Sequence, residues 1–453
     1  MWSRQGALVT TTRDLARFVV ETEGSALPEW TLREATRCFV NYLGVALYAS
    51  QDPSLDILIS QCQEEGGHPR AAVVGTEFRT SLTNAAFING YLAHLEDFDD
   101  THFPTVLHGS TPVYGALFAL AEERHASGKE MLEAFVLGFE TAARIALSVH
   151  PWHYDVGWHV TGTAGVFGAA ASAGRLLKLD TGQMLHALGT SGTQASSIRE
   201  VLGSMCKPMH PAKAASNGLQ AALLAAKGWT SSQTILEGRR GFWHVFSPQH
   251  NADVLTQGLG QRWELAQNGL KPYACGVVAH PLIDAMLEMR RQGVRAADVE
   301  RVEARVHPLV LELMNRPAPR IGLETKFSVQ HAASAALADG ACYPQQFTDA
   351  KAIEPVIAAL RQRIHLTPTA GLDQDQVEVT VRLHGGRAIS HRIEHATGSP
   401  GHPMTDGELD KKFRSLAGAV LAPSHVERLA DAAWHVEAAA DVALIADMCA
   451  RKR

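Results

Sequence analysis

The stretch that decides the fold class is His159-Val-Thr-Gly-Thr-Ala-Gly-Val-Phe-Gly-Ala-Ala-Ala-Ser-Ala-Gly-Arg-Leu-Leu177. Its many glycine residues cost some intrinsic helix propensity, but glycine and alanine together allow neighbouring helices to approach closely. We therefore predict a helix over residues 159–177 that packs tightly against other helices.

The same helical sequence pattern extends in both directions, from about residue 12 to residue 265. Apolar residues recur at spacings of three and four, alanine is abundant, and glycine marks the ends of segments. Asp180 is placed to cap a helix that ends near Gly189, and Gly228 is placed to end another. The further predicted helices span residues 111–124, 129–147 and 212–227.

The sequence pattern changes after about residue 265. Alternation predicts strands over residues 302–307 and 377–383, and Gly385-Gly386 then turns the chain into a hairpin with residues 387–394. Helical patterns return over residues 331–338 and 349–360, where Pro355 kinks the second helix or delays its start. A bridge rich in glycine and proline leads into a final helical segment over residues 406–450.

These patterns predict a mainly α fold with an α+β insert. Residues 1–265 and 403–453 form a large helical domain built from both chain ends, and residues 266–402 form a smaller α+β lid domain. A chain of 453 residues is long enough for two such domains.

The composition excludes several classes of protein. Apolar residues make up 46% and charged residues 19%, with a net charge of −6, which is typical of a globular protein and gives no basic patch for nucleic acid. The six cysteines are scattered without a C-x-x-C pair, which indicates reduced thiols in a cytoplasmic protein. The segment Met1–Asp14 has no long apolar run typical of a secretory signal, and no apolar run is long enough to cross a membrane.

Candidate chemistry is concentrated in residues 94–108, His-Leu-Glu-Asp-Phe-Asp-Asp-Thr-His-Phe-Pro-Thr-Val-Leu-His. Buried charges are costly unless they neutralise one another or serve chemistry, so this density of acids and imidazoles indicates a site. If residues 97–101 are helical, Asp97 and Thr101 share one face. The alternative is a solvated helix end. The candidate site residues in this stretch are Asp97, Asp99, Asp100, Thr101, His102 and His108.

Three further groups of polar residues lie within apolar stretches of the sequence. His159 sits in Gly157-Trp-His-Val-Thr-Gly-Thr163, and it is either a core histidine or a ligand group. Lys207 follows Gly203-Ser-Met-Cys and either reaches solvent or binds a carboxylate. The stretch from Lys271 to His280 caps a domain junction or places His280 in a cleft. Lysine and histidine together suit a carboxylate ligand, whereas the ligand spacing for a metal is weak.

In their order and spacing, these polar groups resemble the sequence pattern of the 2-methylcitrate dehydratase / cis-aconitate decarboxylase superfamily (MmgE/PrpD), which includes iminodisuccinate epimerase. The resemblance runs from near residue 12 to the C-terminus. It is carried by residues 95–102, 157–163 with 167–170, Lys207 with 214–218, 237–242, 271–273 with 280–284, and 326–331 ahead of 338–340.

The resemblance implies a helical large domain, a lid domain, a homodimer and catalysis without metal or organic cofactor. It implies a pocket between the domains whose catalytic residues are Asp97, Thr101, His108, His159, Lys207 and His280. We assign substrate binding to His102, Lys271, Tyr273 and His331. His331 stands where the decarboxylase branch has a tyrosine, and the loop from Thr101 to His108 is one residue longer than in that branch.

We therefore predict a cofactor-independent lyase that moves a proton next to a carboxylate of a di- or tricarboxylic acid, as a 2-methylcitrate dehydratase does. The alternatives within the family are an epimerase, with His331 as a second proton donor, and a decarboxylase. Two alternatives come from other classes. One is a metal-dependent helical enzyme in which Asp97, Asp99 and Asp100 hold magnesium for a diphosphate, and the other is a non-catalytic helical scaffold.

Overall fold

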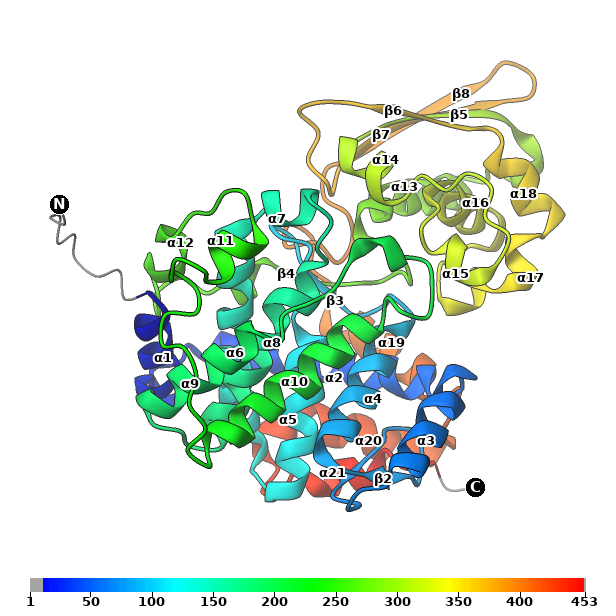
Figure 1. The fold of residues 1–453 in the computed structure, drawn as a ribbon. Coiled ribbons are helices and arrows are strands. Elements are labelled where there is room, and N and C mark those ends of the chain that lie inside the picture. Colours follow the sequence, from blue (N-terminus) through cyan, green and yellow to red (C-terminus); the bar gives the residue numbers. More distant parts are fainter. Residues whose placement is uncertain (1–10, 452–453) are drawn as a thin grey trace, which may run out of the picture.

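The structure, a computed structural model, describes residues 11–451 and is mainly helical (Figure 1). Residues 1–10, which hold most of the segment examined for a secretory signal, lie outside the described residues. Within the described chain, no helix is both long and apolar enough to span a bilayer.

A large helical body contains the N-terminal half of the chain. Its helices are α1 (Thr11–Glu21), α2 (Glu29–Ala49), α3 (Ser54–Glu65), α4 (Leu82–Leu95), α5 (Ser110–Arg124), α6 (Gly128–Val149), α7 (Trp152–Asp155), α8 (Val160–Leu176), α9 (Thr181–Gly192), α10 (Met209–Ala225), α11 (Phe242–Phe246) and α12 (Asp253–Thr256). The helices predicted over residues 111–124, 129–147, 159–177 and 212–227 are confirmed to within three residues at either end.

Helix α8 lies against α5, α6 and α10, and its small residues allow this packing. A Cβ on Gly168 would come within 2.7 Å of the Ala142 Cβ, and a Cβ on Gly218 would come within 2.5 Å of the Ala169 Cβ. Asp180 caps α9 as predicted, because its side chain accepts from the Gln183 backbone N–H at 2.8 Å.

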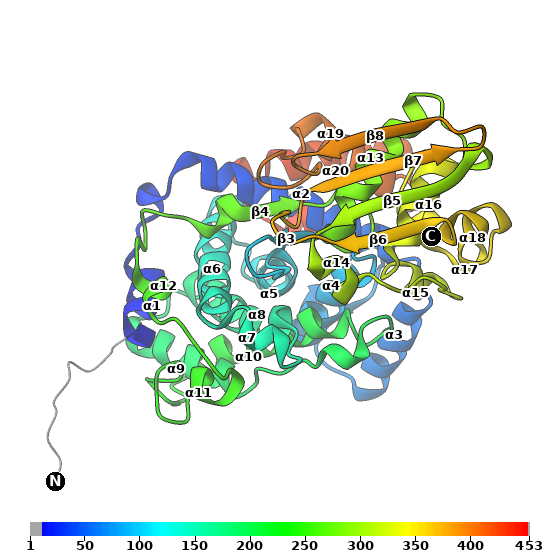
Figure 2. The same ribbon diagram turned by 90° about the horizontal axis from the view of Figure 1, so that it is seen from above.

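The last part of the chain packs against this body (Figures 1 and 2). Helix α19 (Asp406–Ala417) lies against α2, α20 (Pro423–Trp434) also contacts α2, and α21 (Ala443–Met448) contacts α5. The segment predicted as helical over residues 406–450 is therefore confirmed as three separate helices.

Between these parts lies a smaller region with a four-stranded sheet, seen at the upper right of Figure 1. The strands are β5 (Val299–Val306), β6 (Ile364–Pro368), β7 (Val377–Leu383) and β8 (Ala388–Ile393), in the order β6-β5-β7-β8. Its helices are α13 (His280–Arg291), α14 (Pro308–Leu313), α15 (Gly322–Thr325), α16 (Val329–Asp339), α17 (Asp349–Ala352) and α18 (Pro355–Arg361).

The predicted hairpin is confirmed, since β7 and β8 pair antiparallel and Val377, Val379 and Val381 are buried on one face. Pro355 starts a new helix, α18, and so divides the predicted 349–360 helix in two. Strand β6 was not predicted, and it pairs parallel with β5.

Two short ladders lie outside the four-stranded sheet. Strand β1 (Ala71–Ala72) pairs with β2 (Arg79–Thr80), and β3 (Asp100–His102) pairs antiparallel with β4 (Asn268–Leu270). The second ladder joins segments that are far apart in the chain and positions the site described next.

Candidate functional site

A buried cavity lies where β3, α8 and the segment before α10 meet the small region. Its polar wall consists of Asp97, Thr101, His108, His159, Lys207 and Lys271. Its apolar wall consists of Val106, Tyr154, Leu202, Gly276, Val277, Val278, Leu313, Met314 and Phe327. The structure therefore brings six of the ten sequence-predicted site residues to one place.

A turn and a strand, rather than a helix, position the acid-rich stretch. Helix α4 ends at Leu95, and Asp97 then adopts a left-handed conformation with φ of 52° that reverses the chain into β3. The conditional expectation of a helix over residues 97–101 is therefore wrong. Pairing of β3 with β4 instead brings Asp97 and Thr101 beside Lys271, which follows β4 directly.

Asp97 links two lysines from distant segments. Its Oδ1 accepts from Lys207 Nζ at 2.8 Å and from Lys271 Nζ at 2.7 Å. Burial alone would raise the pKa of Asp97, but the charges of Lys207 and Lys271 outweigh it and hold that pKa well below its usual range. Asp97 is therefore an anion that pairs with both lysines, and Lys271 Nζ also lies 3.7 Å from Oδ1 of a second carboxylate, Asp99.

The tautomer of His108 is set by a backbone carbonyl. His108 Nδ1 lies 2.8 Å from the carbonyl oxygen of Asp100, so Nδ1 carries the proton and donates it. The backbone N–H of His108 donates to Thr161 Oγ1 at 3.1 Å, which fixes the loop against α8. In the neutral ring, Nε2 is left with a free lone pair that can accept a proton.

His159 precedes the first turn of the small-residue helix α8. Its backbone N–H donates to the Ser197 carbonyl at 3.0 Å, and its Nδ1 lies 2.9 Å from His210 Nδ1, so one of these nitrogens donates to the other. Burial, followed by the neighbouring His210, lowers the pKa of His159 well below its usual value. His159 is therefore a neutral imidazole at pH 7.

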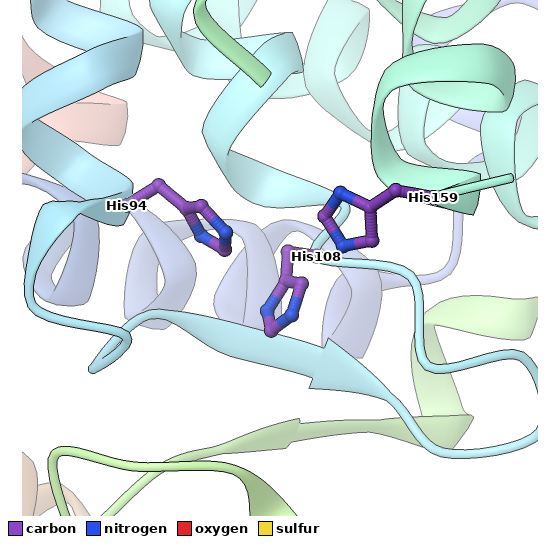
Figure 3. Close-up of side chains that lie close together, drawn as sticks. All are labelled: His94, His108 and His159. Atoms are coloured by element: carbon purple, nitrogen blue, oxygen red, sulfur yellow. The ribbon is translucent and has the colours of Figure 1, made fainter. Parts of the chain in front are cut away.

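His94 is a part of the cluster that was not predicted as a site residue, and it is held by Asp99, a candidate of the acid-rich stretch. His94 Nδ1 donates to Asp99 Oδ2 at 2.7 Å, and Thr111 Oγ1 donates to the same oxygen at 2.8 Å. The centroids of the His94 and His108 rings lie 4.5 Å apart, and Figure 3 shows both rings beside His159. Burial lowers the pKa of His94 to about 3. The signal was available, because His94 opens the acid-rich stretch of residues 94–108.

Comparison with known protein families decides the identity of the fold. Residues 13–255 match the MmgE/PrpD N-terminal domain, and residues 273–438 match the MmgE/PrpD C-terminal domain. The chain belongs to the MmgE/PrpD family. The resemblance inferred from the polar groups of the sequence is thereby confirmed.

Curated relatives from this family are distant but cover most of the chain. Cis-aconitate decarboxylase of Mus musculus is 26% identical over 441 residues, covering 93% of this chain and 90% of the relative. Cis-aconitate decarboxylase of Homo sapiens is 28% identical over 370 residues, covering 78% and 76%. A cis-aconitate decarboxylase-like protein of Aspergillus oryzae is 24% identical over 463 residues, covering 95% of each chain.

Two residues expected in the MmgE/PrpD pocket lie close to it without lining it. His280 starts α13, and its Nε2 donates to the Cys275 carbonyl at 3.3 Å while its ring packs against Tyr273 at 5.2 Å. The hydroxyl of Tyr273 donates to Asp284. Burial lowers the pKa of His280 to about 3. Both side chains therefore lie behind Lys271.

The structure places His102 and His331 outside the cavity lining of this MmgE/PrpD chain. His102 bonds Thr105 Oγ1 at 2.8 Å and Glu264 Oε2 at 3.3 Å. His331 Nε2 donates to the Gln346 carbonyl at 2.8 Å, and Arg361 donates to its Nδ1 at 3.2 Å. Both rings have their two nitrogens occupied by groups away from the cavity.

The three aspartates of the magnesium alternative have separate partners. Asp97 pairs with lysines, Asp99 with His94, and Asp100 accepts from Ser110 Oγ at 2.6 Å and Asn268 Nδ2 at 2.7 Å. Within residues 11–451, Asp100 joins none of the groups whose donor atoms lie close enough to share an ion. The arrangement does not support a tri-aspartate magnesium site.

Proposed function

We propose that this chain is a lyase that binds a tricarboxylic acid in the cavity and moves a proton at the carbon beside a carboxylate. The observation that carries the proposal is one buried cavity lined by Lys207, Lys271, His108 and His159. The lysines bind the carboxylates. The imidazoles transfer the proton: His159 has a lowered pKa, and the tautomer of His108 is fixed by a hydrogen bond.

The favoured reaction is dehydration. The free Nε2 of His108, or that of His159 when its Nδ1 donates to His210, accepts a proton from the carbon next to a carboxylate. The C–H electron pair moves onto that carboxylate, where Lys207 stabilises the developing charge. This electron pair then forms the carbon–carbon double bond and expels the hydroxyl group from the neighbouring carbon. The hydroxyl group takes up a proton and leaves as water.

The apolar wall indicates which tricarboxylate is bound. Val277, Val278 and Met314 line the cavity, and their side chains offer no hydrogen bond to a carboxylate. Such a wall suits an alkyl substituent, as in 2-methylcitrate, better than it suits the unsubstituted acid. Decarboxylation of cis-aconitate is the second candidate, because the curated relatives carry that name. The epimerase alternative is weaker, since His331 does not reach the cavity.

Nuclear magnetic resonance in deuterated water tests the proposal directly. The purified chain is incubated with 2-methylcitrate, citrate, cis-aconitate and iminodisuccinate, each with and without a chelator. We expect 2-methylcitrate to lose water, with deuterium exchanged at the carbon beside a carboxylate and no effect of the chelator. Release of carbon dioxide from cis-aconitate alone would assign the second candidate, and no exchange with any compound would overturn the proposal.

We also propose the boundaries of the domains and the assembly. Residues 1–265 and 403–453 form the large domain and residues 266–402 the lid, which the packing of α19 against α2 supports. Two such chains form a homodimer. Light scattering on the purified chain tests the assembly, and a mass of one chain at micromolar concentration would contradict it.

A further inference from the structure

We propose that His94, His108 and His159 form a binding site for a transition-metal ion of the zinc type, and that the bound ion blocks the cavity. The binding is independent of the proposed function, whereas the inhibition rests on it. The ion is an inhibitor in this proposal and takes no part in the reaction.

The spacing of the three rings carries the proposal. One ring nitrogen of each histidine lies within 4.8 Å of a nitrogen of each of the other two, and Figure 3 shows the rings gathered together. In a tetrahedral zinc site with Zn–N bonds of about 2.0–2.1 Å, ligand nitrogens lie roughly 3.4 Å apart. Small rotations of the three side chains would therefore close the site around an ion.

The orientation of the rings matches that of metal ligands. A ligating histidine usually donates its other ring N–H to a carboxylate or a backbone carbonyl. Here His94 Nδ1 donates to Asp99, and His108 Nδ1 donates to the Asp100 carbonyl. His159 Nδ1 is paired with His210. All three Nδ1 atoms are thus engaged. The Nε2 lone pairs of His94 and His108 are left for an ion, and that of His159 is left in the tautomer whose Nδ1 donates to His210.

One of these Nε2 atoms lacks any partner. His94 is fully buried, and its Nε2 forms no hydrogen bond. An unpaired buried polar atom costs about 1–3 kcal/mol, and a metal–nitrogen bond would satisfy it.

The charges around the rings define the class of ion. Lys207 and Lys271 oppose a cation, but both are paired with Asp97. Asp97 and Asp99 also form an overlapping donor group with His94 and His108. Imidazole donors favour zinc, nickel or copper over magnesium or calcium. The fourth position stays open to water or to a substrate carboxylate, so the ion and the substrate compete.

Calorimetric titration of the full chain with zinc chloride, without substrate, tests the binding. We expect one ion per chain and a loss of affinity of at least tenfold in His94→Gln and in His159→Gln. Cobalt(II) should give the visible absorption of a tetrahedral site in the wild type. The matched control is His244→Gln, because His244 also lies beside another imidazole, His250, at a ring distance of 5.2 Å, but is exposed. This control and Cys206→Ser, which removes an exposed thiol, should bind zinc as the wild type does.

Binding that survives both cluster variants, or that disappears with His244→Gln or Cys206→Ser, would overturn the site. If His94→Gln does not fold, His159→Gln and the cobalt spectrum decide. Full turnover at saturating zinc would overturn the inhibition and leave the binding intact. A chain that binds zinc but converts no tricarboxylate would contradict only the proposed function.

Discussion

The two walls of the cavity are built differently. The polar wall is held by hydrogen bonds, such as those from His108 to the Asp100 carbonyl within the large body and from Lys271, just beyond β4, to Asp97. Much of the apolar wall, including Val278 and Met314, comes from the small region and offers only van der Waals contact. In the proposed reaction, the preorganised groups of the polar wall would carry the chemistry, and the apolar wall would select the substituent on the substrate.

The largest effect should come from Lys207→Met. Lys207 supplies charge to the cavity, whereas Asp97 keeps its second partner, Lys271, when Lys207 is removed. We expect kcat/KM to fall about 1,000-fold, which corresponds to roughly 4 kcal/mol of lost transition-state stabilisation. Steady-state kinetics measure the loss, and thermal denaturation should show a folded protein.

Lys213→Met is the matched control, since Lys213 is an exposed lysine on α10, close to Lys207 in the chain. Its kcat/KM should match that of the wild type. Equal kinetics for the two variants would mean that Lys207 only fills space in the polar wall.

The second largest effect should come from a residue behind the polar wall. Lys412 Nζ donates to Asn41 Oδ1 and to the carbonyls of Phe98 and Lys271, each at 2.7 Å. Burial lowers the pKa of Lys412, but three acceptors match the three N–H bonds of an ammonium group, so we assign the charged form. Lys412→Met leaves these acceptors unpaired, and we expect the free energy of unfolding to fall by about 3 kcal/mol.

Chemical denaturation measures this loss. Lys411→Met provides the control, because Lys411 is the exposed neighbour on the same helix and should change stability by less than about 0.5 kcal/mol. A Lys412→Met variant as stable as the control would show that α19 does not support the loops of the site.

The sequence predicted the long, periodic elements better than the short ones. Alternation identified residues 377–383, and they form β7. Strand β3 has only three residues, too few to show a period, so the acid-rich stretch gave a helical expectation that is wrong. Helical spacing places Lys412, but not Lys411, on the apolar face of α19 with Leu409 and Leu416. The sequence could not reveal the acceptors that receive the hydrogen bonds of its ammonium group. The sequence resemblance to the decarboxylase branch placed His331 in the pocket. It could not reveal that Gln346 and Arg361 hold the His331 ring outside the cavity lining.

A smaller effect should follow from changing the apolar wall alone. Val278 is 3% exposed and lines the cavity. Val278→Thr keeps the shape but adds a hydroxyl group, so we expect the preference for 2-methylcitrate over citrate to fall about tenfold. The ratio of the two kcat/KM values measures the preference. Val294→Thr, at a buried valine that does not line the cavity, should leave the ratio unchanged even if it lowers stability.

The smallest effect concerns His331, which lies outside both walls. Burial lowers its pKa from 6.5 to about 4, so between these pH values the unfolded chain binds a proton that the folded chain does not. The stability that the neutral ring provides is complete above pH 6.5 and is lost as the pH falls towards 4. Replacing the ring in His331→Gln removes this term. Between pH 6 and pH 5 the variant should therefore lose about 1 kcal/mol less stability than the wild type.

Denaturant titrations at both pH values measure this difference in stability. The kcat/KM for 2-methylcitrate at pH 7 should stay within about twofold of the wild type, because the ring does not touch the cavity. A variant that folds normally at pH 7 but loses most of its turnover would place His331 among the groups that act on the substrate, and the chemistry would then not be confined to the polar wall.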